Sequence, residues 1–570
     1  MNKIKIPVYI ILISSVLFSL STLSFSFDIS LLAFPLSIIY AAIVFYFLYL
    51  KALSKKEFKA ALVSRKLLQY ICFVFFLTFI LRRAGKYETF YWLDVVSVLL
   101  WCVTFVVSLI ILHYFKDKRL YSLEESWKNF KKPAGKIIAV SKEKRKSFFR
   151  EIVDWIDALF QAIFMVLLIQ IFVFQLYVIP SESMVPYFLI GDRVVVFKIF
   201  SGPKFPLSEV GLPDFKKYKR GDVVVFRNPH YSLDRKSEIK TVLSQIIYML
   251  TFTGVNLNVD ENGEIKADPL VKRICGEPGE QLVMQDGILY ARTKENNAFI
   301  PVEYDSKIAA WNLNPLVESR AKKKQIQYVP LTQSQYDQMI LTEDMKNNLD
   351  IEKTIEECKL IAEKIKKSNI NLVEFQDYFN SVFHFNGKPF SSVDNFVHFM
   401  TDWINTKNES LQKISNDIYS LSNYKLNLLI KLNVGKTVLQ FIKLKDSPSE
   451  KDFSSDSVIE ECSKNIELLY NYLRILDSRN MPVFPPNNQD GSAQYIPENC
   501  YFMMGDNRFN SFDMRHRDEL VETKITPFDN YSFSYYSNVN PIIVPQKLIL
   551  GSTGFRFWPL SRHVRASKIK

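Results

Sequence analysis

The fold is decided by the stretch Ile179-Pro180-Ser181-Glu182-Ser183-Met184-Val185-Pro186, which is followed by Gly191-Asp192. This stretch comes directly after a long apolar run from Ile156 to Val178. Serine and proline often mark the ends of helices, so a polar turn that closes a membrane-spanning helix would give the same pattern. Taken alone, the stretch does not separate that plain turn from a site that holds a reactive serine pair.

Further stretches extend the pattern in a fixed order along the chain. They are Arg-Gly-Asp-Val-Val-Val-Phe at 220–226, Val-Lys-Arg-Ile-Cys-Gly-Glu-Pro-Gly-Glu at 271–280, and Gly-Asp-Asn-Arg-Phe-Asn-Ser-Phe-Asp-Met-Arg at 505–515. Four ordered motifs are far more specific than one Ser-x-Ser. Together they resemble the motif boxes of bacterial type I signal peptidase, the membrane-bound Ser/Lys leader peptidase. The resemblance covers Ile179–Tyr290 and Glu498–Leu560, and leaves out the N-terminal region and the long segment between the last two boxes.

Composition argues against a nucleic-acid-binding protein and against a metal-binding protein. The chain has 570 residues and a formal net charge of +13, but its basic residues gather between apolar runs rather than in aromatic-rich patches. That distribution indicates membrane topology and not nucleic-acid binding. The six cysteines form no CxxC pair and the six histidines are scattered. We therefore expect no metal site and no cofactor.

The N-terminal part predicts several membrane spans, since a helix needs about 20 apolar residues to cross a bilayer. The five apolar segments are Ile6–Phe27, Ile29–Leu50, Leu67–Leu81, Phe90–Phe115 and Trp155–Val178. The third is short, which leaves open whether it spans, tilts or re-enters. The first resembles a cleaved leader, but its length and the apolar run that follows argue against that interpretation.

Basic residues near the membrane set the expected orientation. Lys51–Lys66 and Lys116–Arg150 are rich in lysine and arginine and should face the cytoplasm. The fifth span then crosses outward and places Ser183 at the outer membrane surface, and the resemblance implies that this membrane is the bacterial inner membrane. Arg82, Arg83 and Lys86 conflict with this orientation, because their loop would lie outside.

The rest of the chain predicts an α+β protein with an antiparallel, mainly β catalytic core interrupted by helices. Short β-branched runs read as strands, with Asp286-Gly287 as a hairpin turn. Helical spacing appears at Glu343–Lys367, Val373–Phe383, Val393–Ile404, Ser410–Leu432 and Ser457–Leu476. The Pro-rich run Met481–Pro486 is interpreted as a linker, and Leu548–Leu560 as a last strand with an aromatic rim.

The expected parts of the chain are 1–150 (multispanning region), 151–178 (last transmembrane helix), 179–292 (first part of the core), 293–497 (helical insertion) and 498–570 (second part of the core).

The helical insertion has two interpretations. A long insertion can be an elaborated surface loop without chemistry, or a module for a partner or for substrate access. The sequence does not choose between them.

A serine hydroxyl needs a base that takes its proton, and no histidine–aspartate pair stands near Ser183 in the motifs. Lysine has a reference pKa of about 10.4 and serves as a base only where burial lowers that pKa. Lys272 lies in an apolar, strand-like run, with Arg273 expected on the opposite face. An exposed lysine on an edge strand is the plainer interpretation of Lys272, and the motif context argues against it.

The resemblance implies a role for each matching residue. Ser183 matches the nucleophile and Lys272 the general base, while Ser181 and the Ser183 backbone N–H would form the oxyanion hole. Ser511 matches the serine that orients the lysine. Supporting roles fall to the ion pair Asp513 and Arg515, to Asp506 and Arg508, which are expected to brace the turn, and to Met184 under the first specificity pocket.

The sequence departs from the family pattern at Phe509, where Asp is usual, and at Met514, where Ser is usual. Neither position is catalytic in the family. Glu182 stands where a small residue is often found, and the spans and the insertion exceed the usual number and length.

The resemblance implies a serine endopeptidase that removes signal peptides from exported preproteins after small-x-small sites. Its partners would be those preproteins, the lipid bilayer and the secretion translocon, with no nucleic acid. Two alternatives remain: a related processing peptidase with a narrow substrate, and a membrane scaffold with a vestigial peptidase core.

Overall fold

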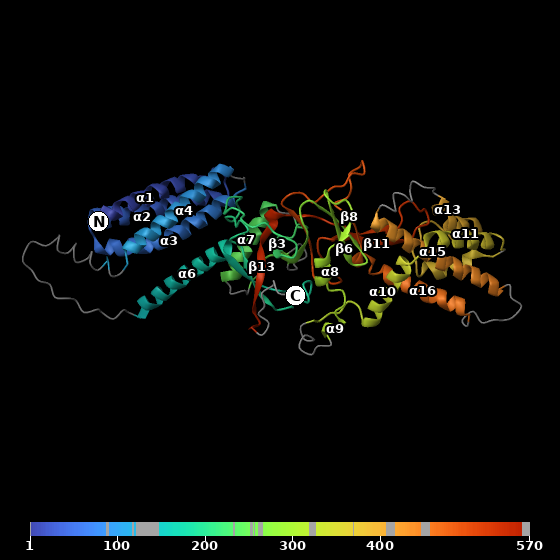
Figure 1. The fold of residues 1–570 in the computed structure, drawn as a ribbon. Coiled ribbons are helices and arrows are strands. Elements are labelled where there is room, and N and C mark those ends of the chain that lie inside the picture. Colours follow the sequence, from blue (N-terminus) through green and yellow to red (C-terminus); the bar gives the residue numbers. More distant parts are fainter. Residues whose placement is uncertain are drawn as a thin grey trace, which may run out of the picture. The chain divides into compact units, whose positions relative to one another are not determined.

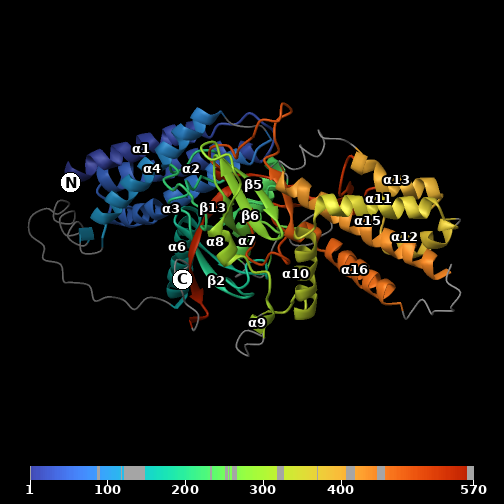
Figure 2. The ribbon, with the colours of Figure 1, turned by 45° about the vertical axis from the view of Figure 1, so that its right-hand side comes forward.

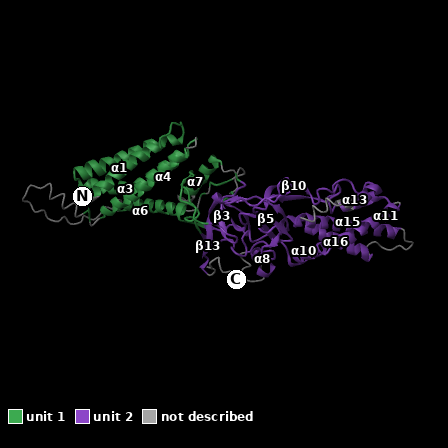
Figure 3. Ribbon diagram, turned by 45° about the horizontal axis from the view of Figure 1, so that its top comes forward, with its two compact units in different colours: residues 1–176, 196–216, 231–268 green, residues 177–195, 217–230, 269–570 purple. Residues whose placement is uncertain are grey.

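The computed structural model describes residues 2–86, 90–116, 119–120, 148–231, 234–250, 255, 257–259, 266–317, 326–368, 370–405, 417–445 and 456–560 (Figure 1). The chain divides into two compact units (Figure 3). Unit 1 comprises residues 1–176, 196–216 and 231–268, and unit 2 comprises residues 177–195, 217–230 and 269–570. The chain passes between them within β1 (Phe174–Val178) and β2 (Arg193–Phe197).

Unit 1 contains the helices α1 (Asn2–Ser21), η1 (Ile29–Leu32), α2 (Ala33–Val44), η2 (Phe45–Ser54), α3 (Phe58–Arg83), α4 (Tyr91–Tyr114), α6 (Phe148–Phe172) and α7 (Arg235–Leu250). The first four numbered helices lie side by side (Figure 1 and Figure 2). Within the described residues, five helices are long and apolar enough to cross a membrane. This confirms five apolar helices, but the last transmembrane helix predicted over 151–178 is wrong at its end, because α6 ends at Phe172 and Phe174–Val178 forms a strand. Most of the basic segment Lys116–Arg150 lies outside the described residues.

The third helix is longer than the sequence predicts. α3 has 26 residues, because it continues through the polar residues that precede the apolar stretch Leu67–Leu81. At its end the Arg83 Nε lies 3.3 Å from an Asp94 carboxylate oxygen at the start of α4. Asp94 is buried, so this pair neutralises one of the basic residues that conflict with the predicted orientation.

Unit 2 contains an antiparallel sheet in which five strands have the order β13-β3-β4-β9-β12. They are β13 (Ile549–Trp558), β3 (Val223–Phe226), β4 (Leu270–Gly276), β9 (Cys500–Met504) and β12 (Val544–Pro545). A second sheet has the order β7-β6-β5-β8, from β7 (Ile300–Pro301), β6 (Ile288–Thr293), β5 (Glu280–Gln285) and β8 (Met481–Phe484). The two strands β10 (His516–Lys524) and β11 (Ser534–Val539) pair with each other. The predicted antiparallel core is therefore confirmed.

The turn between β5 and β6 forms as predicted. Gln285 pairs with Ile288, so the loop holds only Asp286 and Gly287. Both have positive φ, 51° and 76°. A two-residue loop with positive φ at both positions matches the right-handed twist of the flanking strands, which is why Asp-Gly predicts it.

The interpretation of Met481–Pro486 as a linker is wrong. Met481–Phe484 forms β8, in which Met481 pairs with Met284 and Phe484 with Leu282. The sequence pattern did not predict this strand, because proline is rare inside strands and Pro482 lies within it. It is tolerated because β8 is the edge of its sheet, where a missing N–H breaks no ladder.

Between the two parts of the core the chain forms α8 (Glu303–Ile308), α9 (Asn314–Val317), α10 (Gln333–Asn347), α11 (Ile351–Lys366), η3 (Leu372–Phe375), α12 (Gln376–Asn380), α13 (Val393–Asn405), α15 (Ile418–Lys445), α16 (Ser457–Leu473) and α17 (Leu476–Arg479). The single helix predicted over Glu343–Lys367 is wrong. It breaks at Asn348–Asp350, because the Asp350 carboxylate caps α11 by accepting the Lys353 N–H at 3.1 Å. The start of the predicted Ser410–Leu432 helix lies outside the described residues.

These helices do not form a surface loop. Their apolar core includes Ile525 and Phe533, which come from the second part of the β core. Lys431 of α15 lies 2.5 Å from an Asp529 carboxylate oxygen, with both side chains fully buried. Cutting the helices away would expose that core and leave the Asp529 carboxylate without its cation.

Candidate active site

Ser183 lies on the loop between β1 and β2, which closes on itself at its base. The Ile179 N–H donates to the Asp192 carbonyl at 2.8 Å, and the Gly191 N–H donates to the Ile179 carbonyl at 2.9 Å. Gly191 has a φ of 82°, a conformation that favours glycine. The Ser181 and Ser183 hydroxyl oxygens lie 3.4 Å apart. The structure thus brings the two predicted serines together on one tight loop.

Met184, predicted to lie under the nucleophile, is buried with Val185. A short loop anchored by two buried apolar side chains holds its neighbouring serine in a fixed place. Ser181 is exposed and Ser183 partly exposed, so the hydroxyl pair faces the solvent side of this anchor.

Lys272 lies inside β4 and is 3 % exposed. It pairs with Val224 of β3 on one side. Burial lowers the pKa of Lys272 from 10.5 to about 8, although the nearby Asp513 carboxylate opposes that shift. An amine of this kind is neutral in a useful fraction of molecules near neutral pH, as a general base requires.

Gly505 is the point where the predicted residues meet. β4 and β9 pair Arg273 with Met504, and continuing that register by one residue places Lys272 opposite Gly505. A Cβ atom on Gly505 would lie 2.1 Å from the Ser511 hydroxyl oxygen and 2.5 Å from the Ser183 carbonyl oxygen. The Ser183 carbonyl, the Ser511 side chain and, by register, the Lys272 backbone therefore lie beside one glycine that has no room for a side chain.

The Ser511 hydroxyl oxygen is buried and has no hydrogen-bond partner among the residues that the structure describes. A buried hydroxyl without a partner is costly, so it marks a place where another polar group is expected. The register of β4 with β9 places the Lys272 backbone opposite Gly505, against which the Ser511 side chain lies.

Asp513 and Arg515 form the predicted ion pair, and both are fully buried. The Arg515 Nε donates to one Asp513 carboxylate oxygen at 2.8 Å, and the other oxygen accepts the Gly505 N–H at 2.9 Å. Burial alone would raise the pKa of Asp513, but the Arg515 guanidinium outweighs it and holds that pKa well below its usual range. The pair thus fixes the backbone of the glycine at which the site converges.

Asp506 and Arg508 were expected to brace their own turn, but the structure pairs them with residues far along the chain. Asp506 accepts two hydrogen bonds from the Arg273 guanidinium, at 2.8 and 2.6 Å. Arg508 donates to the Asp305 carboxylate of α8 at 2.5 Å. Sequence reasoning missed Arg273 and Asp305 as partners. Asp305 carries no signal in the sequence, because it belongs to no motif.

Glu182 was interpreted only as a variant of a small residue, and the structure gives it contacts of its own. Glu182 stands between the two serines in the sequence, and its side chain is buried. Its carboxylate accepts the Tyr328 N–H at 3.3 Å. The Asn507 side-chain amide donates to the Glu182 backbone carbonyl, and the Asn507 N–H donates to that of Ser183, both at 3.1 Å. The last motif box is therefore hydrogen-bonded directly to the serine loop.

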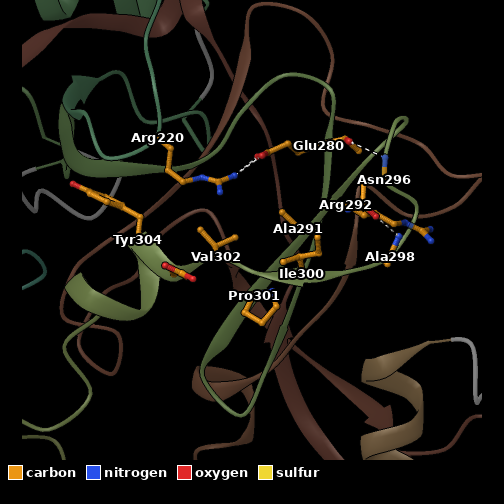
Figure 4. A pocket seen from close by; sticks show the side chains of 12 residues that line it. Arg220, Glu280, Ala291, Arg292, Asn296, Ala298, Ile300, Pro301, Val302 and Tyr304 are labelled. Atoms are coloured by element: carbon orange, nitrogen blue, oxygen red, sulfur yellow. Dashed lines mark hydrogen bonds and ion pairs between the residues drawn. The ribbon is translucent and has the colours of Figure 1, made fainter.

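A separate cavity of about 310 Å³ lies between β6, β7 and α8 (Figure 4). The Arg220 guanidinium pairs with Glu280 along its wall (Figure 4). The predicted catalytic residues Ser183 and Lys272 and the predicted supporting residue Ser511 do not line it. It is therefore distinct from the serine–lysine site.

Comparison with known proteins finds similarity in the part of the chain that carries Ser183 and Lys272. Residues 152–353, which include Ser183 and Lys272, match the family model described as signal peptidase, peptidase S26. The chain is 29 % identical to signal peptidase I P of Bacillus subtilis subsp. natto over 160 residues, which are 27 % of this chain and 58 % of that protein. It is 27 % identical to signal peptidase I of Haemophilus influenzae over 150 residues, 26 % of this chain and 41 % of that protein.

A third relative, signal peptidase I of Buchnera aphidicola subsp. Schizaphis graminum, is 37 % identical over 92 residues, 16 % of this chain and 28 % of the relative. The matched region thus spans between 28 % and 58 % of the length of these relatives. No solved structure matches the chain. The region that holds the serine loop and the buried lysine is therefore similar to bacterial signal peptidases I over about a third of the chain.

Proposed function

We propose that this protein is a membrane-bound serine endopeptidase that removes signal peptides from exported preproteins. One observation carries the proposal: Ser183, Lys272 and Ser511 converge on Gly505. Two of them lie in the region that matches the signal peptidase family.

The proposed chemistry is acyl transfer. The neutral Lys272 amine takes the Ser183 hydroxyl proton as the oxygen attacks the carbonyl carbon of the scissile bond. The tetrahedral intermediate places its negative charge near the Ser183 N–H and the Ser181 hydroxyl, which act as the oxyanion hole. The proton then passes to the leaving amine. Lys272 next takes a proton from water, which attacks the acyl-enzyme and releases Ser183.

Ser511 and the Asp513–Arg515 pair serve as positioning residues in this proposal. The unpartnered Ser511 hydroxyl can accept a hydrogen bond from the lysine amine and hold its lone pair toward Ser183. With a pKa of about 8, about one tenth of the Lys272 amines are neutral at pH 7.

We infer that the substrate binds as an extended strand beside the serine loop, with small residues before the cut and Met184 shaping the first pocket. The helices of unit 1 hold the protein in the bacterial inner membrane. The catalytic unit then faces outward, close to the secretion translocon, where signal peptides emerge. Anchoring of this kind raises the local concentration of substrate and reduces the need for tight binding.

The test of this function is cleavage of a preprotein with a small-x-small site by the purified protein in detergent. We expect one cut after the second small residue, located by the mass of the mature product. Ser183→Ala should abolish the cut, whereas Ser492→Ala, at an exposed serine far along the chain, should leave it unchanged. A folded wild-type protein that leaves several such preproteins intact would favour the scaffold alternative. Cleavage of one preprotein only would favour the narrow processing peptidase.

Gly505→Ala offers a test of the convergence itself. The added methyl group would collide with Ser511 and with the Ser183 carbonyl, so both must shift. We expect kcat to fall about 100-fold, since a displacement of about 1 Å at a catalytic group has that effect. The control is Gly554→Ala in β13, where a Cβ meets no atom within 4 Å. Equal activity of the two variants would contradict the arrangement.

A further inference from the structure

A short segment, Ile326–Val329, lies against the serine loop, and we refer to it as the strap. Ile326 is buried in a small apolar cluster with Val185 and Leu189 of the serine loop, and Val329 packs on that cluster. The strap comes from the long segment between the third and fourth motif boxes, far from the serines in sequence. Its packing makes it a part of the surroundings of the serine loop.

Glu182 fastens the strap. Glu182 is 5 % exposed, and its carboxylate accepts the backbone N–H groups of Gln327 and Tyr328. The second carboxylate oxygen accepts from the Asn510 side-chain amide at 3.3 Å. A buried carboxylate requires such donors, and here two of them belong to the strap. Glu182 therefore joins three segments: the serine loop, the strap and the last motif box.

The position of Glu182 places the strap close to the site. Because Glu182 stands between Ser181 and Ser183, the backbone of Tyr328 lies within one hydrogen bond of the residue between the two serines. The Tyr328 side chain is 57 % exposed. A large aromatic group that stays exposed beside a reactive loop offers contact area with little loss of conformational entropy on binding.

From this arrangement we propose that the strap forms one wall of the preprotein groove. Tyr328 is a specificity-determining residue that contacts the preprotein near the cleavage site, and Glu182 is the positioning residue that holds the strap in place. The inference rests on the proposed function and deepens it, since it names a substrate contact that the motif boxes do not contain.

Kinetics separate this role from a structural one. Tyr328 contacts the substrate in the ground state and in the transition state alike, so Tyr328→Ala should raise KM about tenfold and leave kcat unchanged. Glu182→Ala should raise KM similarly, because it releases the strap. Glu182→Gln should keep the wild-type KM, because its side-chain carbonyl oxygen still accepts the strap N–H groups. Its amide nitrogen can donate to the Asn510 side-chain oxygen once the Asn510 amide group has rotated. Tyr536→Ala, at a tyrosine of β11 that is 67 % exposed, is the matched control.

A photo-crosslinking experiment tests the contact without cleavage. We would place p-benzoylphenylalanine at position 328 in the Ser183→Ala background and irradiate it with the preprotein. The expected result is a crosslink to the residues around the small-x-small site, absent with the probe at position 536. Equal or no crosslinking at the two positions, or an unchanged KM in Tyr328→Ala while the wild type cleaves, would overturn the inference. Crosslinking at position 328, together with a folded wild type that cleaves no preprotein, would instead refute the proposed function and leave the strap contact standing.

Discussion

Lys272→Met should abolish cleavage and at the same time stabilise the folded protein at neutral pH. Without the amine no group takes the Ser183 proton, and general-base catalysis alone accounts for about 10²–10⁴-fold in rate. The gain in stability follows from burial. The pKa of Lys272 falls from 10.5 in the unfolded chain to about 8 in the fold. Holding the charged amine there therefore costs on the order of 3 kcal/mol. A methionine side chain occupies a similar buried volume without a charge.

The size of this stabilisation depends on pH. Below pH 8 both states carry the proton and the full cost applies. Between pH 8 and about 10.5 the unfolded state binds more protons than the folded state, so the stability of the wild type rises with pH. The advantage of Lys272→Met should therefore be largest at pH 7 and disappear near pH 10.5. Thermal unfolding in detergent at both pH values measures it.

Lys431→Met is the matched control for this experiment. Lys431 is equally buried and burial lowers its pKa to about 8 as well. It differs from Lys272 because it is paired with the buried Asp529 carboxylate. Removing it leaves that carboxylate unpaired, so we expect lower stability and retained cleavage by the folded fraction. A Lys272→Met variant that still cleaves, or that unfolds more easily at pH 7, would contradict the proposed base.

Arg515→Ala should have the largest effect on stability. The substitution leaves the Asp513 carboxylate buried and unpaired, which costs about 3–5 kcal/mol. It also removes the hydrogen bonds that the Arg515 guanidinium donates to the carbonyls of Ser478 in α17 and of Arg508, at 2.9 and 3.0 Å. The last motif box then loses its link to the helical insertion.

The same substitution should move the pH dependence of cleavage. Arg515 lowers the pKa of Lys272, and Asp513 raises it. Loss of the guanidinium leaves the carboxylate unopposed, so the pH at which activity is half-maximal should rise by about one unit. The double variant Asp513→Asn with Arg515→Met removes both charges and should be more stable than Arg515→Ala. An unshifted profile in a folded Arg515→Ala variant would show that this pair does not act on Lys272.

Much of the site follows from sequence because its residues belong to motifs. Ser181 and Ser183 lie on one short loop, and the Lys272 strand is recognisable from its apolar neighbours. Their convergence on Gly505 could not be predicted, since it depends on the register of β4 with β9. The pairing of Arg508 with Asp305 likewise depends on where α8 packs, which no local pattern encodes.

The fold, like the site, has some features that the sequence predicts and others that it does not. Asp286-Gly287 predicts its turn because a two-residue loop needs positive φ at both positions. Pro482 misled the interpretation of β8, because only the position of the strand at the sheet edge makes proline acceptable. The helical insertion could not be assigned from its spacing, because its core is completed by Ile525 and Phe533 from another part of the chain.

The most direct test of the serine–lysine mechanism is the pH dependence of kcat/KM for cleavage of a small-x-small preprotein by the wild type. With Lys272 as the base at a pKa of about 8, kcat/KM should rise about tenfold per pH unit from pH 6 and level off above pH 8. Lys272→Met should be inactive throughout. A rate that stays constant or falls between pH 6 and 9, or a folded wild type that cuts at no pH, would contradict the account.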